Sequence, residues 1–270
     1  MSINLVVALM PEAKPLISHF DLAAVNTRSP LPVFQRDGIR LIVSGIGAAA
    51  AAAATGYLFA QQQQRDLAWL NVGVAGHGCL AIGEGRLMHK ISEHNSGRNW
   101  FPPQTLKLGV ASDALNSVSR IERRYAQPQF YDMEAAAYYA TACRFSSGEL
   151  VQCFKIVSDN PSHPVDAVNA DTARTLIGAQ MKSLDRVVTA LSALSDTAIK
   201  AVTEPAALDA CLSRWSFTVT QQNQLYRLLQ RLEILEPAPA NKAPDLGHCQ
   251  SATAVLAALN RQVNQLFVQP

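Results

Sequence analysis

The sequence predicts an α/β domain followed by a helical C-terminal extension. Up to about residue 198, short β-branched runs alternate with helical segments, which is typical of a sheet covered by helices on both faces. Of the 270 residues, 49% are hydrophobic, so the chain can bury a substantial core. Further along, helical patterns continue without a convincing strand. We therefore expect a domain over residues 1–198 and a helical extension over residues 199–270.

The first half of the domain predicts two buried strands, a hairpin and two helices. The strands are apolar and β-branched, the hairpin has an Asp-Gly turn, and the second helix is rich in alanine, the residue of highest helix propensity. In chain order we expect a strand over residues 3–10, a helix from about Glu12, a hairpin over 33–45 with its turn at Asp37-Gly38, a helix from Ile46 to the glutamine run, and a strand over 67–76.

The rest of the chain predicts further strands and helices, with Ser112 or Asp113 as a suitable helix N-cap. We expect short strands at about 86–91, 106–111 and 128–131, a helix from Asp113, a helix that contains Glu134, a central strand over 148–160 and a long helix over 165–194. In the extension we expect helices over 206–215, 221–232 and 251–267, and a Pro-rich linker over 236–247 that favours polyproline II or disorder.

The composition argues against several classes of function. A formal charge of +2 without a clustered basic stripe argues against nucleic-acid binding. The five cysteines form no CxxC pair, so we expect reduced thiols rather than disulfides or a metal site. His77, His89, His94 and His163 lack metal-ligand spacing, and we expect each to be an isolated surface or loop residue.

The N-terminus predicts neither a signal peptide nor a membrane span. It has no basic segment, and its apolar run ends after a few residues at Pro11-Glu12. We therefore expect a cytoplasmic protein that does not bind membranes.

Three carboxylates share one position in the pattern, just past the end of a predicted strand. They are Glu12, Glu134 and Asp159. In open α/β sheets, ligands bind outside the carboxyl ends of the strands. Two other strand ends carry glycines, in SGIG up to Gly47 and in GVAG up to Gly76, whose N–H groups could face an anion or a hydroxyl.

Each carboxylate also has a simpler interpretation. Glu12 suits the first turn of a helix, where the dipole favours an acid, and Asp159 suits a turn or helix cap. Glu134 is harder to explain in this way, because its neighbours look buried and a lone buried carboxylate is costly. The chain contains no dinucleotide fingerprint, no GxxxxGK[ST] and no GxSxG.

The order of several motifs resembles the purine nucleoside phosphorylase/nucleosidase superfamily. VALMPEAKPL, SGIGAAAAA, NVGVAG, ASDALN, YDMEAAA and KIVSDN follow one another at roughly the spacing of that family over about residues 3–195. The chain looks most like the nucleosidase branch, which includes 5′-methylthioadenosine/S-adenosylhomocysteine nucleosidase and futalosine hydrolase. The resemblance implies a three-layer αβα fold with a central twisted mixed sheet, a nucleoside as the small-molecule partner, and no cofactor or metal. It also implies a homodimer.

The resemblance further implies a role for each motif residue. Asp159 matches the general acid that protonates the leaving base at N7, with Ser158 as its support. Glu12 matches the acid that activates the attacking water. Glu134 matches the residue that binds the ribose hydroxyls, with Met133 packed against the sugar. N-glycosidic cleavage passes through an oxocarbenium-like transition state, so a proton donor and a carboxylate suit it chemically.

The sequence departs from the family pattern at several positions. Lys155 stands where nucleosidases usually have an arginine, so the bidentate fork is lost. Leu115 and Asn116 fall beside the base in the family, but Leu115 replaces an aromatic stacking residue. The glycine strand reads GVAGH rather than GSAGG. Stacking would then need another ring from Trp100, Phe101 or Tyr131.

We therefore expect a purine nucleosidase that hydrolyses an adenosine-like nucleoside. No arginine-rich GxPxR phosphate loop is visible near Glu12, which favours water over phosphate as the nucleophile. Two alternatives stay open. One is a phosphate-dependent phosphorylase. The other is a nucleoside-binding module in which the substitutions at Lys155, Leu115 and His77 have removed turnover.

Overall fold

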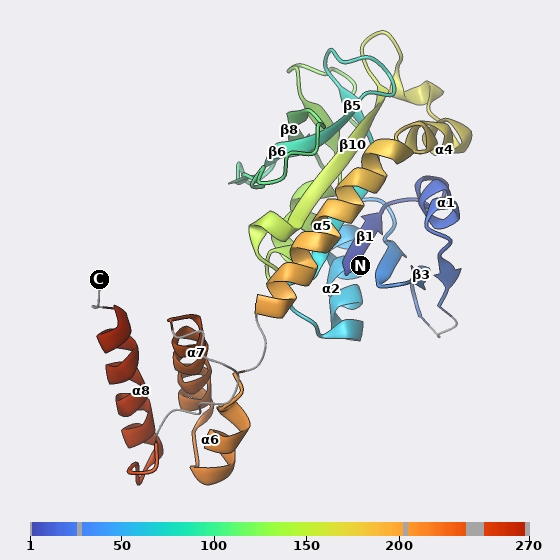
Figure 1. Cartoon of the computed structure of the whole chain (residues 1–270). Helices are drawn as coiled ribbons and strands as arrows, with labels where there is room; N and C mark the ends of the chain where they lie inside the picture. The colour runs from blue at the N-terminus through green and yellow to red at the C-terminus, as the bar shows by residue number, and fades with distance from the viewer. Residues whose placement is uncertain (1, 26–28, 202–204, 236–245, 268–270) are drawn as a thin grey trace. The chain divides into compact units, whose positions relative to one another are not determined.

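The computed structural model describes residues 2–25, 29–201, 205–235 and 246–267 (Figure 1). The chain divides into two compact units, residues 1–199 and 200–270. Of the linker predicted over residues 236–247, only Leu246 and Gly247 are among the described residues.

The first unit contains the strands and five of the described α-helices. In chain order the elements are β1 (Ile3–Val7), α1 (Met10–His19), β2 (Ala23–Ala24), β3 (Val33–Arg36), β4 (Ile39–Val43), α2 (Ala48–Gln62), β5 (Ala68–His77), β6 (Gly85–Glu93), β7 (Asn99–Trp100), β8 (Ser112–Ser117), β9 (Phe130–Asp132), α3 (Ala135–Ala142), β10 (Val151–Asp159), α4 (Ala170–Ala179) and α5 (Met181–Ala201). Single 3-10 turns precede β10 and α4.

The described strands form one ten-stranded mixed sheet in the order β10-β6-β8-β9-β5-β1-β4-β3-β2, with β7 paired to β6. Parallel pairs include β1 with β4 and with β5, whereas β6 and β10 are antiparallel. The strand β10 also pairs with β5. The five strands β5, β9, β8, β6 and β10 therefore close into a ring of pairings, which leaves no free strand edge there.

Helices cover both faces of the sheet and create two buried cores. On one face, α1, α4 and α5 pack on side chains such as Leu5, Leu70 and Ile156. On the other face, α2 and α3 pack on Val6 and Trp69. Figure 1 shows α4 and α5 lying across one side of the strands. The expected three-layer αβα architecture with a central mixed sheet is thus confirmed.

Two predictions around residues 106–117 are wrong. The helix predicted from Asp113 is instead β8, which pairs in parallel with β6 and β9. The side chains of Leu115 and Ser117 are buried, and that of Asn116 between them is half-buried. This strand alternation overrides the capping signal of Ser112-Asp113. Residues 106–111 form no strand, and their apolar side chains pack on the first core instead.

The long helix predicted over residues 165–194 is interrupted. A 3-10 turn opens the segment, and α4 begins after Asn169, whose side chain accepts hydrogen bonds from the N–H groups of Asp171 and Thr172. The helix ends at Gln180, and α5 starts at the next residue. The Gln180 side-chain amide donates to the Gly83 carbonyl at 2.8 Å, so this break is tied to the turn that precedes β6.

The second unit is helical in its described part. It contains α6 (Leu208–Arg214), α7 (Val219–Leu235) and α8 (Ala252–Phe267), with a core of its own around Leu225, Val255 and Leu259. The described helices of the whole chain include none long and apolar enough to span a membrane.

Replacing a buried phenylalanine by alanine should cost far more unfolding free energy than replacing an exposed one. Phe154 is fully buried in β10, and Phe101 is 67% exposed. Phe154→Ala should lower the free energy of unfolding by about 3–5 kcal/mol, because it removes buried apolar surface and leaves a cavity. Urea unfolding followed by circular dichroism checks this value. Phe101→Ala is the matched control and should change it by about 0.5 kcal/mol or less.

Candidate active site

A cavity of about 200 Å³ opens at the carboxyl ends of the central strands. Its lining comes from the segments that follow β1, β4, β8, β9 and β10, and from the ends of β5, β9 and β10 themselves. Much of the lining is apolar. Among the described residues that line it, every charged one is a carboxylate, namely Glu12, Glu122, Asp132, Glu134 and Asp159.

Glu12 is held by backbone amides at the start of α1. One carboxylate oxygen accepts the N–H of Val74 and the other accepts the N–H of Leu9, both at 2.9 Å. Only 3% of the residue is exposed. Burial raises the pKa of Glu12, and these amides together with Lys155 offset part of that rise. The carboxyl group is therefore suited to accept a proton inside the cavity.

Gly73 leaves room for this arrangement. A Cβ atom at that position would lie 3.0 Å from Glu12 Oε1 and 3.4 Å from Lys155 Nζ. The bare backbone of β5 thus lets a carboxylate and an ammonium group approach the strand together.

Glu134 is the N-cap residue of α3 and lines the cavity. Its Oε1 accepts the N–H of Gly47 at 2.6 Å, and its Oε2 accepts the N–H of Met133 at 3.2 Å. Burial raises the pKa of Glu134, the carboxylate of Asp132 raises it further, and Lys155 opposes both. The Gly47 amide predicted to face a ligand is thus used by this carboxylate.

A buried ion pair lies beneath the carboxylates. Lys155 Nζ is 2.9 Å from Asp132 Oδ2, and both side chains are at most 2% exposed. Burial by itself would lower the pKa of Lys155, but the charges of Asp132 and Glu134 outweigh it and raise that pKa. Lys155 is therefore a buried cation that compensates several carboxylates.

Asp132 has a second task, which the sequence did not reveal. Its Oδ2 accepts the N–H of Ala135 at 2.9 Å, and its Oδ1 accepts the Ser117 hydroxyl at 2.6 Å. That hydroxyl in turn accepts the N–H of Ala136 at 3.0 Å. The first turn of α3 is thus anchored to β8, and this anchoring places Glu134. The Asp-Met-Glu run after a strand is the signal that could have revealed it.

Asp159 ends β10 and projects its carboxyl group to the cavity. The Ser158 hydroxyl donates to Oδ1 and the Tyr125 hydroxyl donates to Oδ2, each at 2.5 Å. Tyr125 comes from the irregular segment between β8 and β9, which periodicity could not place. The structure therefore brings Glu12, Glu134 and Asp159 to one cavity and adds a hydroxyl that sequence reasoning missed.

The other expected site residues divide into two groups. Met133, Ser158 and Gly76 line the cavity together with the three acids. Four others do not line it, namely Gly47, Leu115, Asn116 and Lys155. Leu115 is fully buried in the second core, because β8 continues past the point where a helix was expected. Val118 and Ile121, which follow β8, line the cavity instead.

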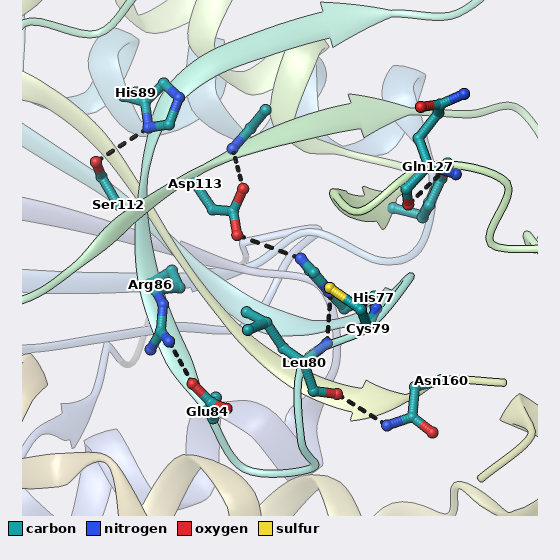
Figure 2. Close-up of polar contacts among 12 residues, drawn as sticks. His77, Cys79, Leu80, Glu84, Arg86, His89, Ser112, Asp113, Gln127 and Asn160 are labelled. Carbon is teal, nitrogen blue, oxygen red and sulfur yellow. Dashed lines mark hydrogen bonds and ion pairs between the residues drawn. The ribbon is translucent and has the colours of Figure 1, made fainter. Parts of the chain in front are cut away.

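His77 is not the surface residue that we expected. It is 1% exposed, and its Nδ1 accepts the backbone N–H groups of Cys79 and Leu80 at 3.0 and 2.9 Å. Its Nε2 therefore carries the hydrogen and donates to Asp113 Oδ2 at 3.2 Å. Asn160, next to Asp159, donates to the Leu80 carbonyl at 2.8 Å. Figure 2 shows this chain of contacts from Asp113 to Asn160.

The cysteines are free, as expected, in every case that the structure describes. Within the described ranges, no group of three or more His, Cys, Asp or Glu side chains is placed to hold a metal ion.

The ion pair predicts that Lys155→Met is strongly destabilising. Removing the ammonium group leaves Asp132 and Glu134 buried without their cation, which should cost about 3–5 kcal/mol of unfolding free energy. Chemical denaturation of Lys155→Met, Asp132→Asn and the double variant forms a double-mutant cycle. The double variant should be more stable than the two single losses added together. Additive losses would contradict a direct interaction.

His77 predicts a loss of stability in mild acid. Burial lowers the pKa of His77 in the folded protein, whereas the unfolded chain takes up this proton near the ordinary value of about 6.5. Stability present at neutral pH should therefore fall as the pH drops below about 6.5. Melting temperatures from pH 7.5 to 5 should decline less steeply for His77→Gln than for the wild type. His89→Gln, which changes an exposed ring, should keep the wild-type slope.

A scan against protein-family models finds no match, and no curated protein matches. Solved structures do match. The 5′-methylthioadenosine nucleosidase of Arabidopsis thaliana is 17% identical at a TM-score of 0.61, covering 72% of this chain and 98% of its own. An MTA/SAH nucleosidase is 21% identical at a TM-score of 0.60, and the match covers 72% of this chain and 98% of that one. The futalosine hydrolase of Helicobacter pylori is 14% identical at a TM-score of 0.57, and the match covers 70% of this chain and 97% of that one. The chain therefore has the nucleoside phosphorylase-like fold of these nucleosidases.

Proposed function

We propose that this protein is a purine nucleosidase that hydrolyses the N-glycosidic bond of an adenosine-like nucleoside. The observation that carries the proposal is the convergence of Glu12, Glu134 and Asp159 on one cavity at the sheet end. The names of the structures that share the fold, methylthioadenosine nucleosidase and futalosine hydrolase, support the reaction class.

Each acid has a defined task in this reaction. Asp159 gives its proton to N7 of the base while the bond between C1′ and N9 breaks and its electron pair goes to the base. Glu12 takes a proton from water, whose oxygen bonds to C1′, and the products are the free base and the sugar. Glu134 accepts hydrogen bonds from the ribose hydroxyls, and Met133 packs on the sugar. The raised pKa of Glu12 suits a base that must hold this proton.

The charge of the cavity favours water over phosphate as the nucleophile. The charged residues among its described lining are all carboxylates, and the buried cation next to them, Lys155, is already paired with Asp132 at 2.9 Å. A phosphate dianion would be repelled by this lining. A phosphorylase is therefore disfavoured, and formation of ribose 1-phosphate would be its signature.

The proposal predicts adenine release from at least one of methylthioadenosine, S-adenosylhomocysteine and adenosine, without added phosphate. Asp159→Asn should lower kcat by about 10²–10⁴-fold, because an amide cannot supply the proton to the base. Chromatography of the free base measures the rate. Asp185→Asn is the control and should leave the rate unchanged, because this carboxylate lies on α5 and contacts His19 at the end of α1.

Three results would contradict the proposal. They are the absence of base release from every nucleoside tested, an unaltered rate in Asp159→Asn, and a strict requirement for phosphate. Nucleoside binding in calorimetry without any release would favour the degenerate binding module instead.

A further inference from the structure

Tyr125 lies behind the carboxyl group that the proposed reaction uses as its acid. Its hydroxyl donates to Asp159 Oδ2 at 2.5 Å, yet Tyr125 is absent from the cavity lining to which Asp159 belongs. The tyrosine is 7% exposed and Asp159 is 4% exposed. Because Ser158 occupies Oδ1, each oxygen of the carboxyl group accepts one hydroxyl hydrogen bond. A second lone pair on each oxygen stays available to the ligand side.

Close packing holds the tyrosine in this place. A Cβ atom at Gly76 would lie 2.6 Å from Asp159 Oδ2 and 2.7 Å from Tyr125 Cε1, so only glycine lets the three groups meet. The ring of Tyr131 meets that of Tyr125 edge-on, with centroids 6.2 Å apart. Burial and the hydrogen bond to Asp159 raise the pKa of Tyr125. The phenol therefore keeps its proton and acts as a donor.

The segment between β8 and β9 holds Tyr125 in a backbone conformation that bulky residues rarely adopt. Tyr125 has φ = 47°, in the left-handed region. The Tyr131 hydroxyl accepts the N–H of Gln127 at 2.9 Å, and Arg123 forms a two-pronged ion pair with Asp166. Unusual backbone of this kind is retained where the surroundings over-determine it, and such places are often functional.

We propose that Tyr125 is a positioning residue that orients the Asp159 carboxyl group and stabilises the carboxylate formed when its proton passes to the base. This inference rests on the proposed nucleosidase reaction. Tyr125 keeps its own proton throughout, because its hydroxyl donates to Asp159 both before and after the transfer. Hydrogen bonds donated to a carboxylate favour its charged form. The phenol therefore favours the state in which the proton has passed from Asp159 to the base.

Tyr125→Phe tests this role, because it removes the hydroxyl and keeps the ring. The alkaline limb of the kcat/KM profile should move to higher pH by about one unit, since one hydrogen bond to the carboxylate is lost. The plateau kcat should fall by about tenfold or less. A structural role alone would lower activity or the melting temperature without moving the limb, and that result would overturn the proposal.

Tyr138→Phe is the matched control. Tyr138 is buried too, and its hydroxyl is among the described side-chain atoms without a hydrogen-bond partner. Its removal should leave the limb at the wild-type pH. A shift of equal size in this variant would show that loss of any buried hydroxyl has the same effect, and it would also overturn the proposal.

A second measurement separates this inference from the proposed reaction. Carbon-13 labelling of aspartate carboxyl groups, with Asp159→Asn to assign the signal, follows the titration of Asp159 without any turnover. The midpoint should be higher in Tyr125→Phe than in the wild type. If the wild type releases no base but the midpoint moves, the nucleosidase proposal fails and the hydrogen-bond role stands. An unmoved midpoint overturns the role of Tyr125 in either case.

Discussion

The buried pair of Lys155 and Asp132 is the interaction on which the rest of the cavity depends. Three carboxylates, Glu12, Asp132 and Glu134, surround this single ammonium group, and burial already raises the pKa values of Glu12 and Glu134. Without the cation, mutual repulsion would add to that cost. The pair also fixes geometry, because Asp132 caps α3 and thereby places Glu134. One contact therefore serves charge balance and position together.

Glycines in β5 and backbone N–H groups also hold the buried carboxylates in place. Gly73 and Gly76 let side chains approach β5 more closely than a Cβ would allow. The amides of Val74 and Gly47 bind Glu12 and Glu134 directly. The strand-end N–H groups are thus ligands of the protein's own acids. Lys155 is buried under the lining as a compensating charge, rather than open to the cavity.

Much of the fold, and the position of three acids, could be predicted because the responsible signals are local. A β-branched run followed by a carboxylate places Glu12 and Asp159 at strand ends, and neighbouring strand ends meet at one edge of a sheet. The pairing of Lys155 with Asp132 could not be predicted, because it depends on the register of β10 with β5 and of β5 with β9. Tyr125 lies in a segment without periodicity, so no pattern indicates where it points.

The ring of strand pairings restrains the backbone that carries Asp159 more than the connection that forms another part of the cavity wall. The strand β10, which ends at Asp159, pairs with β5 along most of its length. It also pairs with β6 over Phe154–Ile156. A shift of Asp159 would therefore disturb its pairing with Gly76 of β5, whereas Val118, Ile121 and Glu122 lie on the connection between β8 and β9, outside the paired residues of both strands. Substitutions at Val118 and Ile121 would therefore change the apolar wall of the cavity without touching the strands that hold the Asp159 backbone, whereas a change at Tyr125 on the same connection would reach the Asp159 carboxyl group directly.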